Sequence, residues 1–212
     1  MKILYIPARQ KIFISKETIE EIAKKLPKKV GLITTIQFSY LLKKFYFIFK
    51  EKGKKVFVYR EGIILGCKLE AALKLQDKVS CFLYIGSGNF HPMLLALSLK
   101  KPIFVFNPNS SQFYKLDQEE INKIKARQKA AYVKFLSSDK KGILVSIKPG
   151  QLKLREALEI KKRLEKKGGK VYLFLMDNFV PEQLENWPDL AWLNTACPGL
   201  NLENQLLDYN LI

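Results

Sequence analysis

The chain has 212 residues, of which 48% are hydrophobic and 27% charged, so it can bury a core as one large or two small domains. No apolar run reaches the roughly 18 residues that a membrane span needs, and the start MKILYIPARQ does not have the pattern of a signal peptide. The three cysteines are far apart, which excludes a disulfide framework. We therefore expect a cytoplasmic protein with no membrane association.

The formal net charge of +17 permits two interpretations. Clustered Lys and Arg would favour a nucleic-acid interface, because such residues release counterions from phosphate. Here the lysines are scattered among acidic residues on predicted helix faces, with no Arg-rich arm and no exposed aromatic ladder. We prefer a lysine-rich solvated surface that favours an acidic macromolecular partner. A basic RNA-binding module remains an alternative, and it predicts RNA binding that weakens steeply with salt.

Short β-branched and aromatic runs alternate with helical patterns along the chain. The predicted strands are residues 2–8, 30–35, 55–60, 81–86, 102–107, 142–147, 170–176 and 191–196. The predicted helices are residues 16–25, 37–52, 67–75, 91–99, 117–136, 151–167 and 181–186. Near-continuous apolar strands separated by helices indicate an α/β fold, with parallel sheets covered on both faces.

A polar stretch, NPNSSQFYKLDQEE at residues 107–120, precedes the longest predicted helix and indicates a domain boundary. We therefore predict two small parallel-sheet, three-layer α/β domains in tandem, residues 1–112 and 113–212. Ligands of such sheets bind at the carboxyl ends of the strands. Most of the unusual residues of this chain are predicted to lie there.

The three cysteines differ in their predicted surroundings. Cys67 follows a glycine at the start of a helical pattern, where the helix N-terminus favours the metal-binding thiolate; a small buried residue is the alternative. Cys197 ends a predicted strand, and Pro198 stops that strand from continuing. It is either a metal ligand held on a rigid edge or a thiol packed at a turn. Cys81 opens a hydrophobic strand and is expected in the core. Their spacing matches no zinc pattern.

Glycines and polar residues follow several predicted strands. In YIGSGNFHP (84–92), Gly86 and Gly88 would let a ligand approach the backbone, and the helix after them offers N–H groups to an anion. His91, the only histidine, is equally explained as a cap or packing residue. SIKPGQ (146–151) repeats the strand–turn–helix design with Lys148, and TTIQF (34–38) has polar groups at a strand end. These residues alone indicate a ligand site at the strand ends.

The order of the motifs points to a known family. TTIQF, ILGC, YIGSGNFHP, the Arg127 segment KARQKAA, GILVSIKPGQ and LNTACPGL occur in sequence over nearly the whole chain. Together they resemble the diphthamide-synthesis radical enzymes, the 2-(3-amino-3-carboxypropyl)histidine synthase family in its archaeal form. The resemblance implies three similar α/β domains, each giving one cysteine to a 4Fe–4S cluster. It also implies transfer of a 3-amino-3-carboxypropyl radical from S-adenosylmethionine to a histidine of translation elongation factor 2.

The resemblance assigns roles to individual positions. Cys67 matches the cluster ligand of the middle domain and Cys197 that of the last domain, whereas Cys81 matches no ligand. Six positions match motif residues that face the shared cleft and are therefore candidate contacts of S-adenosylmethionine: Gly86, Gly88, His91, Lys148, Gly150 and Gln151. No catalytic residue is assigned.

The chain also departs from the family pattern. MKILYIPA resembles the first strand of the middle domain, so the first domain and its cysteine have no counterpart here. Gly199 and Asn89 stand where the family usually has arginine, which removes two cations near a carboxylate-bearing cofactor. We expect a separate first-domain partner protein or a homodimer to complete the site. The alternative is a catalytically inactive accessory subunit or relic.

Overall fold

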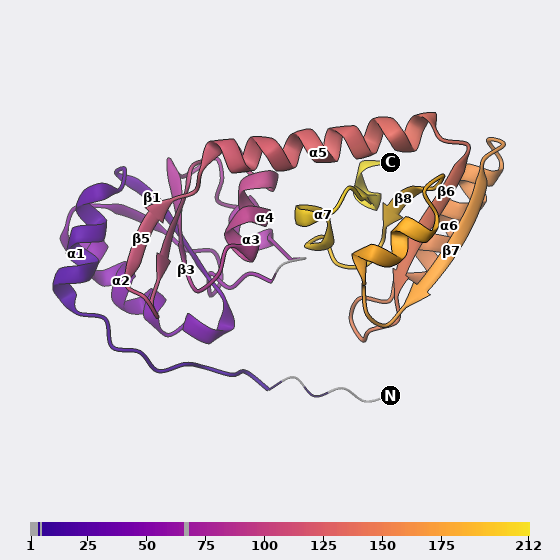
Figure 1. Cartoon of the computed structure of the whole chain (residues 1–212). Helices are drawn as coiled ribbons and strands as arrows, with labels where there is room; N and C mark the ends of the chain where they lie inside the picture. Colours follow the sequence, from indigo (N-terminus) through magenta and orange to yellow (C-terminus); the bar gives the residue numbers. More distant parts are fainter. Residues whose placement is uncertain (1–3, 5, 66–67) are drawn as a thin grey trace. The chain divides into compact units, whose positions relative to one another are not determined.

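The computed structural model describes Leu4 and residues 6–65 and 68–212, which form two compact units, Met1–Ile121 and Asn122–Ile212 (Figure 1). The first unit contains α1 (Lys16–Lys25), β1 (Lys29–Thr34), η1 (Ile36–Phe38), α2 (Leu41–Glu51), β2 (Lys55–Phe57), α3 (Glu70–Leu73), β3 (Cys81–Ile85), α4 (Phe90–Ser98), β4 (Ile103–Asn107) and β5 (Gln112–Lys115). Helix α5 (Gln118–Ser137) begins in the first unit and continues into the second. The second unit also contains β6 (Lys140–Ser146), α6 (Leu154–Glu165), β7 (Lys170–Met176), η2 (Pro181–Asn186), β8 (Ala191–Asn194), α7 (Leu200–Glu203), β9 (Leu207–Asp208) and η3 (Tyr209–Leu211).

The sheet of the first unit has the strand order β2-β1-β3-β4-β5. Strands β1 to β4 are parallel, and β5 runs antiparallel along β4. Every residue of β3 is buried, as expected for a strand covered on both faces. The parallel α/β prediction is confirmed for this unit, although its edge strand β5 was not predicted.

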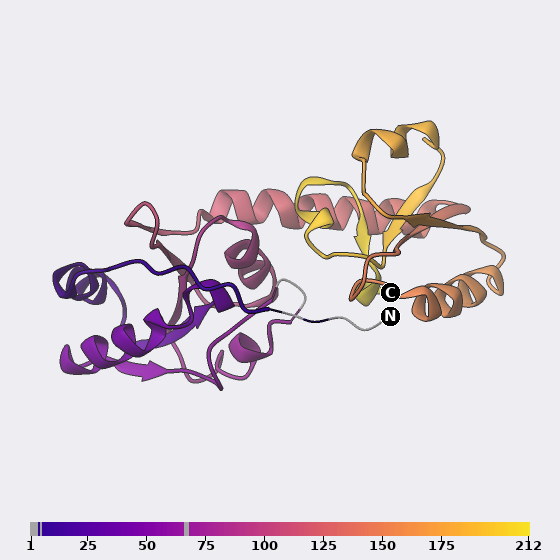
Figure 2. The same ribbon diagram turned by 90° about the horizontal axis from the view of Figure 1, so that it is seen from below.

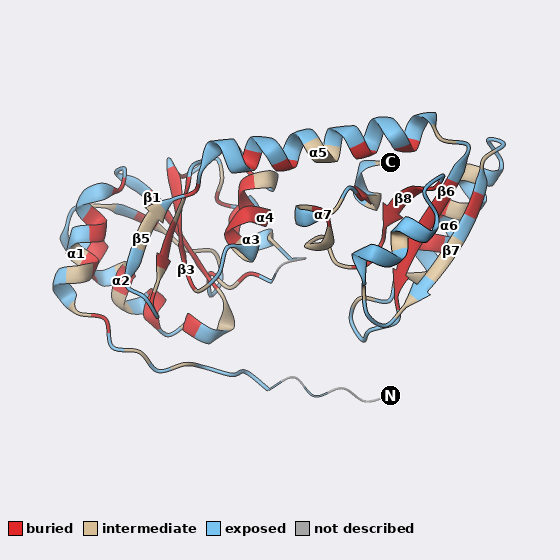
Figure 3. Ribbon diagram, viewed as in Figure 1, coloured by how far each residue is buried: buried red, intermediate tan, exposed pale blue. Residues whose placement is uncertain are grey.

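Side chains alternate between the two faces of this sheet, so each face packs against different helices. Leu32, Leu83 and Ile85 lie in one cluster with the buried faces of α1 and α2. The intervening Tyr84 faces the other layer, where its ring lies near-parallel to that of His91 in α4. Figure 3 shows the buried residues along the central strands and on the helix faces that cover them. The three-layer prediction therefore describes this unit correctly.

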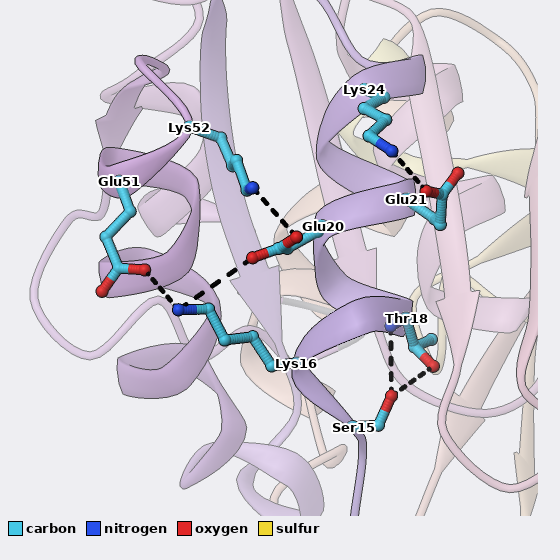
Figure 4. Close-up of polar contacts among 8 residues, drawn as sticks. All are labelled: Ser15, Lys16, Thr18, Glu20, Glu21, Lys24, Glu51 and Lys52. Carbon is cyan, nitrogen blue, oxygen red and sulfur yellow. Dashed lines mark hydrogen bonds and ion pairs between the residues drawn. The ribbon is translucent and has the colours of Figure 1, made fainter.

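Helices α1 and α2 are also joined by charged side chains at the surface (Figure 4). The carboxylate of Glu20 lies 2.9 Å from the Lys52 ammonium and 4.0 Å from that of Lys16. Lys16 in turn lies 2.9 Å from Glu51. Because Lys16, Glu51 and Lys52 are exposed and Glu20 is only partly buried, this network contributes little to stability compared with the apolar contact beneath it.

The second unit repeats the strand order of the first. Its sheet runs β7-β6-β8-β9, entirely parallel, so in both units the second strand in sequence is followed across the sheet by the first, third and fourth. One face packs against α6 and the carboxyl-terminal half of α5, through Phe135, Ile143 and Ile160. On the other face, Leu144 and Trp192 are buried in a cluster that includes Leu184 of η2. Figure 2 shows the segment that contains η2 on one side of this sheet.

Some predicted elements differ from the structure. Residues 2, 3 and 5 of the predicted strand 2–8 lie outside the described residues; Leu4 and residues 6–8 belong to no strand, and Ile6 is exposed. The predicted helix 67–75 is reduced to α3, and 181–186 forms the 3₁₀ helix η2, which begins at Pro181 and buries no residue. The units divide after Ile121 rather than after residue 112, since β5 pairs with β4.

Candidate functional site at the strand ends

Each unit places two candidate loops at the carboxyl ends of neighbouring parallel strands. In the first unit, β1 leads into residues 35–38 and β3 into residues 86–89. In the second, β6 leads into residues 147–153 and β8 into residues 195–199. Parallel strands end at the same sheet edge, so each unit gathers its own candidate residues along that edge.

Gly86 and Gly88, the two glycines after β3, are required for different steric reasons. A Cβ on Gly86 would lie 2.5 Å from the Tyr84 hydroxyl oxygen, and the Gly86 N–H donates to the Phe106 carbonyl at 3.0 Å. Gly88 has a φ of 72°, in the left-handed region that favours glycine, and a Cβ there would meet nothing within 4 Å. The loop therefore leaves open space beside Gly88 for an approaching group.

His91 lies half-buried in the first turn of α4. Its ring is near-parallel to Tyr84, with centroids 6.1 Å apart, and perpendicular to exposed Phe90 at 5.0 Å. Burial lowers the pKa of His91, which favours the neutral imidazole. Burial raises the pKa of Tyr84 to about 12, opposed in part by a hydrogen bond with Thr35, so this phenol stays protonated. At this edge His91 is thus a neutral, partly exposed group that can donate or accept a hydrogen bond, above the buried phenol of Tyr84.

The Cys197 loop is held by two buried polar side chains that sequence reasoning missed. Asn194 Nδ2 donates to the Cys197 carbonyl and to Asn201 Oδ1, both at 2.8 Å, and its Oδ1 accepts from the Ala196 N–H at 2.8 Å. The Thr195 hydroxyl donates to the Leu144 carbonyl of β6 at 2.7 Å. An asparagine inside an apolar strand was the only signal in the sequence. These bonds fix the backbone at the half-buried thiol of Cys197.

Lys148, Gly150 and Gln151 share one exposed turn after β6. Gly150 has a φ of 80°, and the Gln151 N–H donates to the Lys148 carbonyl at 3.0 Å. The Lys148 ammonium donates to Asn178 Oδ1 at 2.9 Å, and no carboxylate among the described residues lies within 4.0 Å of it. The turn therefore holds a cation that can accept an anionic partner.

Cys81 differs sharply from Cys197. Cys67 lies outside the described residues. Cys81 is fully buried at the start of β3, and burial raises its pKa to about 12, so its thiol stays protonated. Cys81 therefore belongs to the core, as predicted.

Iron–sulfur clusters are held by cysteine thiolates. Among the described residues, no three His, Cys, Asp or Glu side chains lie close enough to hold a metal ion. Cys197 fits the role of a single ligand, because it is accessible and its backbone is fixed. The other ligands of a cluster would have to come from outside the described residues.

A model of the diphthamide synthesis protein family matches residues 1–210. The chain belongs to this family. It is 32% identical over 211 residues to the 2-(3-amino-3-carboxypropyl)histidine synthase of Pyrococcus horikoshii, and 35% identical over 217 residues to that of Methanocaldococcus jannaschii. These matches cover 95% and 98% of this chain.

A solved structure agrees with the family assignment. Dph2 from Pyrococcus horikoshii with a 4Fe-4S cluster matches with a TM-score of 0.75 and 33% identity, covering 91% of this chain and 58% of that one. The chain spans about three fifths of the diphthamide synthesis relatives it matches, 60% and 58% of the two archaeal synthases. In the part of the chain that the structure describes, no helix is both long and apolar enough to cross a bilayer.

Proposed function

We propose that this chain forms part of a 2-(3-amino-3-carboxypropyl)histidine synthase that catalyses the first step of diphthamide biosynthesis. The enzyme would transfer a 3-amino-3-carboxypropyl group from S-adenosylmethionine to a histidine of translation elongation factor 2, in the cytoplasm. The observation that carries the proposal is the match to two synthases over at least 95% of this chain. The fixed, accessible Cys197 at the β8 end supports it.

Cys197 and Cys67 would each supply one thiolate to a 4Fe–4S cluster. A bound, reduced cluster would supply the electron needed to cleave the bond between the sulfur and the γ-carbon of S-adenosylmethionine. The remaining ligand and the remaining length of the enzyme would come from another polypeptide, a second copy, or a longer form of the chain. Interfaces between domains resemble those between proteins, so such an assembly is physically reasonable.

The candidate cofactor contacts would bind and orient S-adenosylmethionine. Lys148 would pair with the cofactor carboxylate, and the turn formed with Gly150 and Gln151 would hold that ammonium in place. Gly88, which has open space beside it, would let the cofactor approach the backbone, and Gly86 would leave room for the Tyr84 hydroxyl next to that loop. Neutral His91 would hydrogen-bond with the cofactor.

The test is formation of 5′-methylthioadenosine from S-adenosylmethionine by the anaerobically reconstituted protein under dithionite, alone and with the complementary domain. We expect the wild type to form product. Lys148→Gln should form less, because it raises the half-saturating concentration of the cofactor, whereas the exposed control Lys129→Gln should behave like the wild type. No product from the complete assembly would overturn the proposal. Transfer to elongation factor 2 is then measured by mass spectrometry.

A second candidate, a catalytically inactive accessory subunit, is favoured by Asn89. Asn89 Oδ1 accepts a hydrogen bond from the Tyr114 hydroxyl at 2.6 Å, so a neutral pair stands where the resemblance leads us to expect an arginine. This role predicts binding to the complementary domain without turnover. Product formation in the assay above excludes it.

A further inference from the structure

A cavity of about 570 Å³ opens in the first unit beside α2 and the segment that follows β2. Its size falls within the range of about 300–1,000 Å³ that small-molecule sites occupy. Among the described residues, its lining contains none of the strand-end residues discussed above. The proposed synthase activity therefore assigns no role to this cavity.

Aromatic side chains form one part of the cavity lining: Tyr40, Tyr46 and Phe47. The core-facing side of α2 is occupied by Phe45 and Phe49, which are fully buried, whereas Phe47 is 54% exposed. The rings of Tyr46 and Phe47 are perpendicular, with centroids 5.7 Å apart. Tyr40 is held in place because its hydroxyl oxygen accepts from the Ile12 N–H at 2.6 Å and donates to the Ile12 carbonyl at 3.0 Å. The exposed ring of Phe47 and the fixed ring of Tyr40 therefore offer apolar faces to a planar group.

Positive charge surrounds the same space. Arg9, Lys43 and Arg60 line the cavity, together with one carboxylate, that of Glu61. Among the described residues, neither Arg9 nor Lys43 has a carboxylate within 4.0 Å, and Arg60 has only exposed Glu70 at 3.7 Å. The lining thus carries an excess of cations that can accept an anion.

Arg60 is held there by strained backbone. Its φ is 52°, in the left-handed region, which is unfavourable for a residue with a Cβ. The turn is closed by the Gly62 N–H, which donates to the Tyr59 carbonyl at 2.9 Å. Such strain is concentrated at ligand-binding and active sites. The backbone conformation of Arg60 therefore points to a ligand site independently of the charges and the rings.

We propose that this cavity binds a nucleotide unit, in which a planar base stacks on the aromatic wall and the phosphate pairs with the cations. Stacking surfaces beside cationic side chains are the usual means of holding single-stranded nucleic acid and nucleotides. An acidic peptide would match the charge but has no ring to use the aromatic wall. Strand β2, at the sheet edge, has only three residues, so it offers a short template for a peptide strand.

The source of the nucleotide is either a free nucleotide or an RNA strand. Binding to the full chain is measured with adenosine 5′-monophosphate, ribose 5-phosphate, a labelled single-stranded RNA of about 12 nucleotides, and polyglutamate. We expect the monophosphate to bind more tightly than ribose 5-phosphate, because only the former has a base. If the RNA binds far more tightly than adenosine 5′-monophosphate, the natural ligand is an RNA strand. If the two bind with similar affinity, the natural ligand is a free nucleotide.

Matched variants assign the binding to the cavity. Phe47→Ala should weaken nucleotide binding about tenfold, through lost stacking. Phe13→Ala, which removes a ring that is 85% exposed outside the cavity, should not. Arg60→Ala should make the slope of log binding constant against log salt concentration for RNA shallower by about 1, the share of one phosphate contact. Arg155→Ala on α6 should leave this slope unchanged. Phe47→Leu, which keeps apolar volume without a ring, repeats the test if the alanine variant melts early.

Three results would overturn the proposal. They are no binding of the nucleotide probes, equal binding by Phe47→Ala and Phe13→Ala, or binding of polyglutamate alone. The proposal does not depend on synthase activity, because its measurements need neither iron nor S-adenosylmethionine.

Discussion

At the scale of single residues, the fold places Cys81 and Cys197 in opposite environments. Cys81 is enclosed by the apolar core, and burial raises its pKa to about 12. Cys197 lies half-buried on a loop whose backbone is tied to Asn194. A thiol reacts through its thiolate, so both its burial and its raised pKa make Cys81 unreactive in the folded protein.

Alkylation of the native protein tests this difference. In a Cys67→Ser background, we expect iodoacetamide at neutral pH to modify Cys197 within minutes and to spare Cys81 until the protein is unfolded. Peptide mass spectrometry measures both sites, and alkylation in denaturant provides the control. Modification of Cys81 at the same rate as Cys197 in the folded protein would contradict the assigned environments.

His91 makes stability depend on pH in a predictable direction. Its pKa is lowered from 6.5 by burial, so below about pH 6.5 the unfolded chain binds more protons than the folded chain, and stability falls as pH falls. Since His91 is the only histidine, His91→Gln removes the whole imidazole contribution. The free energy of unfolding of the wild type minus that of the variant should therefore decrease from about pH 7.5 to 5.5. A difference that does not vary with pH would contradict the lowered pKa.

At the scale of elements, the start of α1 depends on a local cap. The Ser15 side-chain oxygen accepts from the Thr18 N–H at 3.2 Å, as Figure 4 shows. Ser15→Ala should lower the free energy of unfolding by about 1 kcal/mol. Ser15→Asp should retain most of the stability that the cap provides, because aspartate also caps helices. Chemical denaturation measures both, with exposed Ser80→Ala as the control. Equal stability of Ser15→Ala and Ser80→Ala would exclude a capping role.

The end of β8 depends on Asn194. Asn194→Ala removes three hydrogen bonds and leaves the Ala196 N–H and the Asn201 amide short of partners in a buried position. We expect a loss on the order of 3 kcal/mol in the free energy of unfolding, and faster alkylation of Cys197 in the native state. Exposed Asn186→Ala serves as the control. An Asn194→Ala variant with unchanged stability and Cys197 reactivity would refute this positioning role.

At the scale of the whole molecule, apolar runs predicted the sheets well, because β3 and β6 are buried almost throughout. The alternation of apolar and polar residues does not reveal whether an apolar segment pairs with a neighbouring strand. The predicted strand 2–8 is therefore wrong for Leu4 and residues 6–8, which belong to no strand. The cation–aromatic cavity escaped prediction because its lining residues are spread along the chain from Arg9 to Glu61. The role of Asn194 escaped it although its partners lie only two to seven residues away, because residue order does not reveal the turn that brings them together. The two candidate edges did follow from the sequence, because parallel strands must end together.

The central claim is that Cys67 and Cys197 bind the iron of a cluster, and anaerobic reconstitution of the full chain with iron and sulfide tests it most directly. Bound iron and the thiolate-to-iron absorption near 400 nm are measured for the wild type and for Cys67→Ala, Cys197→Ala and Cys81→Ala. We predict that the first two variants lose the bound iron and that Cys81→Ala keeps it. Equal loss in all three variants, or iron retained without Cys197, would contradict the claim.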